Sequence, residues 1–498
     1  MVPLEKRLFR TCVLWLFIPL TAGDAGSFNP QDLAARIGRI EDGLIPNPGI
    51  TIKGQPPKKA SLLERMKAYR IPGLSLAVIN NYALEWEEGY GVQEANGTSP
   101  VTPDTLFQAA SISKPVAAAT ALYYVEKGLL GLDEDVNSRL RSWKIPDSPW
   151  MRKGKVTLRR LLSHTAGLTV QGFPGYAAGK ELPSVKQVLD GVKPANTPPV
   201  KVDIEIGSRF RYSGGGYAVL QLLLSDVLGR PFPHIARDAV LIKLDMNQST
   251  FEQPLPQALA GAAASGHRPN GTVLPGKWHS YPEMAAAGLW TTPTDLARFA
   301  LEIMLAEQGK SDRLLSSAMV ELMLTPVKEN YGLGFIVKGS GPDLQFSHSG
   351  GNEGFRCYLV GYPRRGQGAV IMTNNDFGGD FLPELLRSLS AEYGWPDFKP
   401  VEKETVTVAP SELEALAGTY QFAPADRIKI TPGNGCLFAE PVFVPPDGKA
   451  GCVFFPESPT SFFSTETDVT LAFIKDPLGK VTGLTWRRGE TRRQAQKI

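Results

Sequence analysis

Alternation of apolar and polar positions predicts strands at two distant places in the chain, with helical spacing between them. The first strands are Leu74–Ile79 and Leu84–Val92, which a short turn joins as a hairpin. An Ala-rich run that follows the polar turn at Gln108 predicts a buried helix ending near Gly128. From there to about residue 325 the pattern is mainly helical, with many loops rich in Pro and Gly.

Strand patterns return after residue 330 and a closing helix follows them. The expected elements are the strands Tyr331–Val337, Leu344–Ser347, Phe355–Tyr362 and Ala369–Thr373 and the helix Phe381–Tyr393. In the helical middle, helices are expected at Gly216–Leu228 and at Pro293–Glu307, the second capped by Thr292. Strands at both ends of a segment predict one antiparallel sheet assembled from the two ends. The expected fold class is α/β (α+β), an antiparallel sheet flanked by helices with an all-helical subdomain.

The last hundred residues have a different pattern. Residues 399–410, rich in Pro, Glu, Thr and Val, predict a linker. Beyond them, short strands separated by Gly, Pro and Asp turns predict a small β-barrel or sandwich. Since 498 residues exceed one typical core, three segments are expected. They are a signal peptide at 1–25, a main domain at 26–400 and a C-terminal β-barrel domain at 401–498.

The N-terminal residues follow the order of a signal peptide. A positively charged region is followed by the short apolar core Cys12–Leu20 and by the small residues Ala22–Ala25, where cleavage is expected. The apolar run is too short to span a bilayer, and no later segment reaches 18 apolar residues. These features predict an exported protein, periplasmic or extracellular, with no membrane span in the mature chain.

Composition and charge narrow the classes of function. The chain is 42% hydrophobic and 21% charged with a net charge of +3, which is typical of a soluble globular protein. No basic stripe is interleaved with aromatic residues, so nucleic acid is not an expected partner. No cluster of His, Cys and Glu has metal-ligand spacing, and no cofactor is expected. After export, Cys436 and Cys452 could pair, which would leave Cys357 as a buried small side chain.

Ser111 and Lys114 stand three residues apart at the expected start of the Ala-rich helix. That spacing places both side chains on one helical face, with their Cβ atoms about 5–6 Å apart. A hydroxyl beside an amine, near unpaired backbone N–H groups at the positive end of a helix dipole, is typical of a nucleophile site. The pattern alone also fits a Ser that caps the helix and an ordinary helical Lys.

Two later motifs bear on this choice. Tyr212-Ser-Gly-Gly-Gly lies in a turn that enters a helix, where the phenol could face a neighbouring site or pack as an ordinary core aromatic. His348-Ser-Gly-Gly351 ends an expected strand. Its glycines permit close backbone approach, and the N–H of Gly351 could donate to a developing oxyanion.

Together, Ser111-x-x-Lys, Tyr212-Ser-Gly and His348-Ser-Gly, in this order around a helical middle, resemble the motifs of the serine β-lactamase and penicillin-binding-protein superfamily. The similarity is to the class C β-lactamase-like hydrolases, which include carboxylesterases and D-amino-acid peptidases. It covers about residues 60–395, with supporting stretches at Leu161–Leu168 and Ala287–Leu296. It implies a β-lactamase/transpeptidase-like fold, and the C-terminal barrel resembles the lipocalin-like tails of some of these hydrolases.

The resemblance implies a role for each motif residue. Ser111 would be the acylated nucleophile, Lys114 would keep the site basic, and Tyr212 would act as general base or proton shuttle. The backbone N–H groups of Ser111 and Gly351 would form the oxyanion hole. His348 would complete the catalytic set. The product is an acyl-enzyme that water or another acceptor resolves.

Two departures from the family pattern concern the substrate. Gly214 replaces the Asn of the usual Y-x-N motif, so the amide that would hold a substrate amide is missing. His348 replaces the Lys of the usual K-T-G, so a permanent cation becomes an imidazole that is mostly neutral at pH 7. Hydrolysis of esters, small amides or D-amino-acid peptides is therefore expected, with weak or no β-lactamase activity. The alternatives are a catalytically idle peptidoglycan- or ligand-binding protein and an acyltransferase that uses the same acyl-enzyme.

Further residues are expected around the substrate, a small ester or amide. Those assigned to substrate binding are Gly214, Tyr281, Glu283, Asn352, Glu353 and Arg356. His279 is expected to reach the site from the helical side as well, whereas His164 is expected to form a tight turn against the Ser111 helix. A homo-oligomer is a possible assembly.

Overall fold

The computed structural model describes residues 30–152, 154–442 and 450–498. The predicted signal peptide at 1–25 lies outside the described residues. The described chain divides into two compact units, one of Arg70–Gly379 and the other of residues 30–69 together with 380–498. The second unit thus combines early and late parts of the chain, and the boundary expected at residue 400 stays a prediction.

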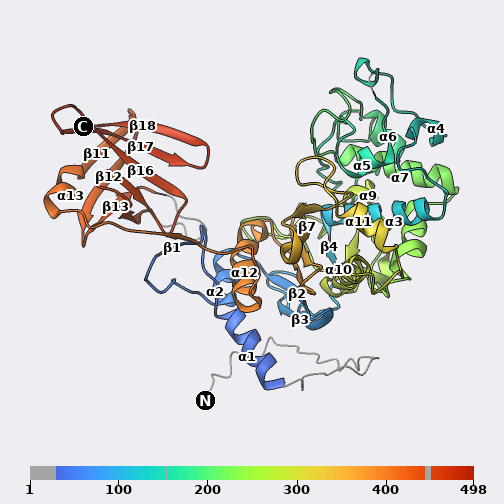
Figure 1. The fold of residues 1–498 in the computed structure, drawn as a ribbon, viewed down its shortest axis with the longest axis horizontal. Coiled ribbons are helices and arrows are strands. Elements are labelled where there is room, and N and C mark those ends of the chain that lie inside the picture. Colours follow the sequence, from blue (N-terminus) through green and yellow to red (C-terminus); the bar gives the residue numbers. More distant parts are fainter. Residues whose placement is uncertain (1–29, 153, 443–449) are drawn as a thin grey trace. The chain divides into compact units, whose positions relative to one another are not determined.

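A six-stranded antiparallel sheet is the framework of the first unit (Figure 1), with the strand order β3-β2-β9-β8-β7-β6. The strands are β2 (Gly73–Asn80), β3 (Ala83–Gly91), β6 (Ile336–Lys338), β7 (Gln345–Asn352), β8 (Phe355–Tyr362) and β9 (Gln367–Thr373). Strand β2 pairs with β9, Leu74 opposite Thr373 and Ile79 opposite Gly368, so the two ends of this unit meet in one sheet. The predicted antiparallel sheet is confirmed, although the strand expected from Tyr331 begins only at Ile336.

Helices fill the segment between β3 and β6. They are α3 (Ser113–Glu126), α4 (Val136–Arg139), α5 (Leu158–Leu162), α6 (Val185–Asp190), α7 (Gly214–Leu228), α8 (Phe232–Ala236), α9 (Met284–Ala287), α10 (Pro293–Glu307) and α11 (Ser317–Met323). Short 3₁₀ turns lie at Ala110–Ile112, Pro149–Met151, Gln257–Ala262 and Gly341–Asp343, and a π-helical turn lies at Arg237–Leu241. Helix α10 begins as predicted, because Thr292 Oγ1 accepts from the N–H of Asp295 at 3.1 Å and Pro293 occupies the first turn. It packs against β2, β3, β8 and β9.

Helix α3 is enclosed along most of its length. All residues from Ser113 to Leu122 are buried, and four of these ten are Ala. Small side chains let α7, α8 and α9 approach α3 closely, which is why an Ala-rich run with no amphipathic stripe can form a core helix. Figure 1 shows α3, α7 and α9 grouped in this part of the fold.

The second unit contains α1 (Pro30–Glu41), α2 (Leu62–Ala68), most of α12 (Gly378–Tyr393) and α13 (Pro410–Leu416). Strands β1 (Ile50–Ile52) and β10 (Val401–Lys403) pair in parallel, so part of the expected linker at 399–410 is a strand. Glu384 on α12 is fully buried and accepts from Arg65 Nε at 2.7 Å and from Tyr69 Oη at 2.8 Å. These bonds tie α12 to α2 and the residues that follow it.

Eight antiparallel strands then close into a barrel, which confirms the expected C-terminal β-barrel. They are β11 (Gly418–Ala423), β12 (Asp426–Gly433), β13 (Cys436–Glu440), β14 (Cys452–Pro456), β15 (Ser461–Phe463), β16 (Val469–Lys475), β17 (Val481–Arg488) and β18 (Thr491–Lys497). Buried apolar side chains, among them Tyr420, Phe454, Phe462 and Leu471, pack together as its core. The disulfide considered between Cys436 and Cys452 does not form, since Ala439 and not Cys436 lies opposite Cys452.

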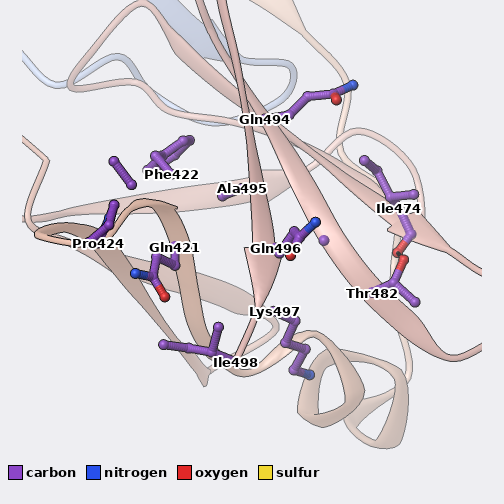
Figure 2. Close-up of a pocket in the computed structure, with 12 residues that line it drawn as sticks. Gln421, Phe422, Pro424, Ile474, Thr482, Gln494, Ala495, Gln496, Lys497 and Ile498 are labelled. Carbon is purple, nitrogen blue, oxygen red and sulfur yellow. Dashed lines mark hydrogen bonds between the residues drawn. The ribbon is translucent and has the colours of Figure 1, made fainter.

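The barrel has an open pocket of about 730 Å³ where β11 and β18 meet (Figure 2). Only Tyr420 and Gln421 of β11 pair with β18, so this seam is short. The lining is mixed, with the apolar Phe422 and Ile474 beside the amides of Gln494 and Gln496. In the part of the chain that the structure describes, no helix has the length and apolar character needed to cross a membrane.

Candidate active site

Ser111 lies on a strained turn and does not cap a helix. The 3₁₀ turn Ala110–Ile112 leads directly into α3, whose cap position is Ile112 and has no side-chain cap bond. Ala110 has φ of 49°, in the left-handed region that residues with a Cβ seldom adopt. The neighbouring N–H of Ala109 donates to Leu289 O at 2.9 Å, and Ser113 Oγ accepts from the N–H of Leu289 at 3.0 Å. Such strain persists only where the surroundings hold it, and it is concentrated at functional sites.

Lys114 points back at Ser111 from the first turn of α3. Its Nζ donates to Ser111 Oγ at 3.0 Å and to Ala286 O at 2.8 Å, and the residue is only 2% exposed. The same Nζ lies 4.9 Å from the ring centre of Tyr212 and 5.7 Å from that of Tyr217. Cation–π contacts of this kind contribute about 0.5–2 kcal/mol. Carbonyl, hydroxyl and aromatic faces thus surround the amine, and no carboxylate of the described residues forms an ion pair with it.

Tyr212 lies just before the start of α7, and its hydroxyl forms no hydrogen bond with the described residues. Ser213 caps this helix, since its Oγ accepts from the N–H of Gly216 at 2.9 Å, and Gly214 is the first, buried residue of the helix. The ring of Tyr212 lies over His164, with 4.3 Å between centres. Among the described residues its hydroxyl has no hydrogen-bond partner, and the side chain is half-buried. The phenol is therefore held by its ring and free at its oxygen.

His164 supports this ring from beneath and is fully buried. Its Nδ1 accepts from the N–H of Ser213 at 3.0 Å, so the second ring nitrogen carries the hydrogen. Four aromatic rings surround it, those of Phe210, Tyr212, Tyr217 and Tyr331. Burial, followed by Lys114 and His348, holds the pKa of His164 well below its ordinary value. The contacts agree with the structural role expected for this residue.

The imidazole of His348 is neutral, and both of its nitrogens form hydrogen bonds. Its Nδ1 lies 2.6 Å from Ser349 O, to which it must donate, and its Nε2 then accepts from Tyr331 Oη at 3.0 Å. Burial, and then the proximity of Lys114, lowers the pKa of His348 to about 3. Neither nitrogen is left to bind an anion. Tyr331, which fixes this state, was not identified from the sequence, where it carried only a strand pattern.

Strand β7 brings its glycines against the Ser111 turn. A Cβ on Gly350 would lie 2.2 Å from Ala109 O and 2.3 Å from Cys357 Sγ, so only Gly fits. Strand β6 pairs with β7 only as far as Ser347, which leaves the following residues of β7 with an open edge. In an antiparallel ladder every second residue directs its N–H to that edge. Gly351 lies next to the hairpin pair Asn352–Phe355, which places its N–H on the open side.

Two of the expected substrate residues are engaged elsewhere. The side-chain amide of Asn352 donates to Gln108 Oε1 at 2.7 Å and to Ala287 O at 3.1 Å, and the residue is buried. Arg356 forms an ion pair with Asp376 at 2.8 Å and donates to Asn352 O. These groups hold the β7–β8 hairpin in place and have little capacity left for a ligand.

The remaining candidates form a separate cluster on the hairpin loop. Tyr281 is buried, and its hydroxyl accepts from the N–H of Glu353 at 3.1 Å and donates to Pro174 O at 3.4 Å. The carboxylate of Glu353 lies 3.4 Å from His279 Nδ1 and 3.5 Å from Arg268 Nε. The structure thus groups Tyr281 and His279 with Glu353 of the hairpin loop and assigns them contacts with each other.

Glu283 is a buried carboxyl at the start of α9. It is fully inaccessible, and among the described residues neither carboxylate oxygen has a hydrogen-bond partner. Burial raises its pKa to about 7. In the part of the chain that the structure describes, no group of three His, Cys, Asp or Glu side chains is arranged to hold a metal ion.

Comparison with known proteins identifies two family models and several related sequences that match this chain. Residues 60–391 match the family model described as Beta-lactamase, and residues 402–498 match one described as a domain of unknown function, DUF3471. Penicillin-binding protein 4 of Amycolatopsis lactamdurans is 27% identical over 383 residues, covering 72% of this chain and 96% of that protein. Penicillin-binding protein 4* of Bacillus subtilis (strain 168) is 23% identical over 413 residues, covering 78% of this chain and 87% of that protein.

Solved structures resemble the fold along most of the chain. The octameric penicillin-binding protein homologue from Pyrococcus abyssi has a TM-score of 0.58 at 19% identity and covers 87% of this chain and 98% of its own. SurE with D-Leu has a TM-score of 0.52 at 25% identity and covers 88% and 97%. The two-part architecture is thus shared with proteins that differ widely in sequence.

The contact of β7 with the Ser111 turn can be tested at Gly350. A methyl group in Gly350→Ala must displace Ala109 O or Cys357 Sγ, and we expect a loss of stability of about 1–3 kcal/mol. A displacement of Ser111, the expected nucleophile, by about 1 Å would cost roughly 100-fold in rate. Urea unfolding and ester hydrolysis measure the two effects. Gly261→Ala is the control, because a Cβ there meets nothing within 4 Å. Equal behaviour of both variants would contradict the assigned contact.

Glu283 predicts a pH dependence of stability. Its folded pKa of about 7 lies above the ordinary value of 4.5, so the folded state binds the extra proton between these values. Stability from this group is complete below pH 4.5 and is lost as pH rises through 7, by about 3 kcal/mol in all. Glu283→Gln should flatten this decline in the free energy of unfolding, measured from pH 4.5 to 8. The exposed Glu181→Gln should leave it unchanged, and an equal decline in Glu283→Gln and wild type would refute the prediction.

Proposed function

The chain belongs to the beta-lactamase family, and from this membership we propose that it is an exported serine hydrolase that forms an acyl-enzyme at Ser111. The family contains penicillin-binding proteins and D-alanine carboxypeptidases, which share serine acyl-enzyme chemistry. The observation that supports the assignment most directly is the 3.0 Å contact between Lys114 Nζ and Ser111 Oγ on the strained turn. A lysine that merely stabilised a helix would have no reason to be buried against a serine hydroxyl.

In the proposed mechanism, Ser111 Oγ attacks the substrate carbonyl and Tyr212, as general base or proton shuttle, takes its proton. Positioned proton transfer of this kind is worth roughly 10²–10⁴ in rate. The tetrahedral oxyanion accepts from the N–H groups of Ser111 and Gly351. Collapse expels the alcohol or amine, which takes the proton from Tyr212. Water then attacks the acyl-enzyme by the same route, giving the acid and free Ser111.

The proposed substrates are esters, small amides or D-amino-acid peptides, with weak or no β-lactamase activity. Because His348 is neutral and both its nitrogens are bonded, it offers no cation to the carboxylate of a β-lactam. Gly214 offers no amide to an acylamino group. SurE, which has a similar fold, was crystallised with D-Leu, and this supports D-amino-acid peptides as proposed substrates.

Export and assembly are part of the proposal. The charged and apolar residues before residue 26 support export to the periplasm or the exterior. The homologue from Pyrococcus abyssi is octameric, which supports a homo-oligomer here as well.

Loss of the nucleophile gives the direct test. Ser111→Ala should lower kcat/KM on p-nitrophenyl butyrate by at least about 10³-fold, since the attacking oxygen is gone. Intact mass spectrometry after treatment with a fluorophosphonate should show one adduct on wild type and none on the variant. Ser142→Ala, on an exposed serine, is the matched control. Undiminished hydrolysis by Ser111→Ala, or no adduct on wild type, would favour the idle protein.

The substrate class is tested with a panel of p-nitrophenyl esters, D-amino-acid anilides and a cephalosporin. Loss of a charge-assisted bond to the substrate carboxylate weakens recognition by about 10- to 100-fold. We therefore expect kcat/KM on p-nitrophenyl esters to exceed that on a cephalosporin by at least this factor, with D-amino-acid anilides between. A cephalosporin hydrolysed as well as the esters would contradict the role assigned to His348.

A further inference from the structure

The segment from Thr169 to Phe173 runs alongside the Tyr212 motif and is bonded to it. Gly214 N donates to Gln171 O at 3.0 Å, and Gly215 N donates to Val170 O at 3.0 Å. Ser213 Oγ donates to Thr169 O at 2.7 Å. The segment is therefore fixed to the first turn of α7 by three successive hydrogen bonds, and it cannot move away from that turn without breaking them.

The segment is also strained where it turns. Val170 has φ of 63°, which is rare for any residue with a Cβ and more so for a β-branched one. Further along, Pro174 O accepts from Tyr281 Oη, and Gly175 lies so close to the Tyr281 ring that a Cβ would meet Cζ at 2.5 Å. Both ends of the segment are thus held, and strain maintained in this way is characteristic of functional sites.

Phe173 fills the space beside Gly214. A Cβ built on Gly214 would lie 2.9 Å from Phe173 Cε2 and 3.3 Å from Phe173 Cδ2, and 3.1 Å from Gln171 O. The direction in which a side chain at this position would extend is therefore occupied by an aromatic ring. The residue is half-buried, so part of its surface remains exposed to solvent. An Asn at residue 214 could not enter this space unless Phe173 moved.

We propose that Phe173 is a specificity-determining residue that presents an apolar wall to the acyl group of the substrate and selects alkyl or aryl acyl groups over acylamino groups. The inference rests on the proposed acyl-enzyme function and names the substrate class of that site. An acylamino group placed against Phe173 loses its hydrogen bonds to water and gains none, whereas an alkyl group of the same length gains burial. The bond that breaks is the ester bond, and the acyl group passes to Ser111 Oγ and then to water.

A pair of esters with acyl chains of equal length tests this preference. p-Nitrophenyl pentanoate and p-nitrophenyl N-acetylglycinate have acyl chains of equal length and differ at the amide. For each ester, kcat/KM is divided by its rate of spontaneous hydrolysis, so that chemical reactivity cancels. Wild type should prefer the pentanoate by about tenfold or more, the range for small changes in an apolar pocket. Phe173→Ala should reduce that preference at least fivefold, while Phe173→Leu, which keeps an apolar wall, should retain it.

A double-mutant cycle supplies the second readout. Gly214→Asn alone should lose activity on both esters, because the new side chain collides with Phe173. Combined with Phe173→Ala it should recover and favour the N-acetylglycinate, so the two changes are strongly non-additive. Phe455→Ala, at an equally half-buried aromatic of the barrel, is the control and should not alter the ratio. Thermal melting of each variant distinguishes lost specificity from lost folding.

The outcomes separate this inference from the proposed function. If wild type forms the Ser111 adduct and hydrolyses both esters equally, or if Phe173→Ala keeps the wild-type ratio, the assignment of Phe173 is wrong and the hydrolase remains. If wild type forms no adduct and hydrolyses neither ester, the proposed acyl-enzyme function is wrong, and the specificity role of Phe173 is wrong as well.

Discussion

The buried amine of Lys114 is the interaction on which the site depends. Taking such a group out of water is costly unless hydrogen bonds replace its hydration. The replacements are Ala286 O, Ser111 Oγ and the faces of two tyrosine rings. They come from α9, from the turn before α3, and from the start of α7. One side chain therefore fixes three elements relative to one another, and Ser111, the proposed nucleophile, is placed by the same contacts that stabilise the amine.

The sheet supplies the other half of that placement. Because β2 pairs with β9, the strands β7 and β8 lie within the same framework as the hairpin that precedes the Ser111 turn. Gly350 and Cys357 then close on Ala109 O, the carbonyl just before the strained Ala110. The unfavourable conformation at Ala110 is thus maintained by contacts from residues about 240 positions away in sequence. Local preference alone would not produce this turn.

The sequence was informative where a pattern is local. Alternation predicted the antiparallel sheet and the barrel, and the spacing of Ser111 and Lys114 predicted their contact. It was silent on Tyr331 and Phe173, whose roles arise from partners at His348 and Gly214 and leave no periodic signal. Asn352 shows the same effect: a polar residue at a strand end suggests a ligand contact, and in the structure its amide donates to Gln108 from across the fold. Cys436 and Cys452 are near in sequence, but the register of β13 and β14 separates them.

The two departures from the family motifs share a physical feature that bears on whether this is a working enzyme. A site that had merely lost its function would leave the space of the missing Asn open and the imidazole at the Lys position unpaired. Here the space beside Gly214 is filled by Phe173, and both nitrogens of His348 are bonded, one of them to Tyr331. Each lost polar group is thus matched by an aromatic side chain that makes the new arrangement complete. Meanwhile the contact between Ser111 and Lys114 and the unbonded hydroxyl of Tyr212 are in place. In the proposed hydrolase, this combination is what selection for a different acyl group would produce, since it changes recognition and leaves the proposed acyl-transfer residues in place.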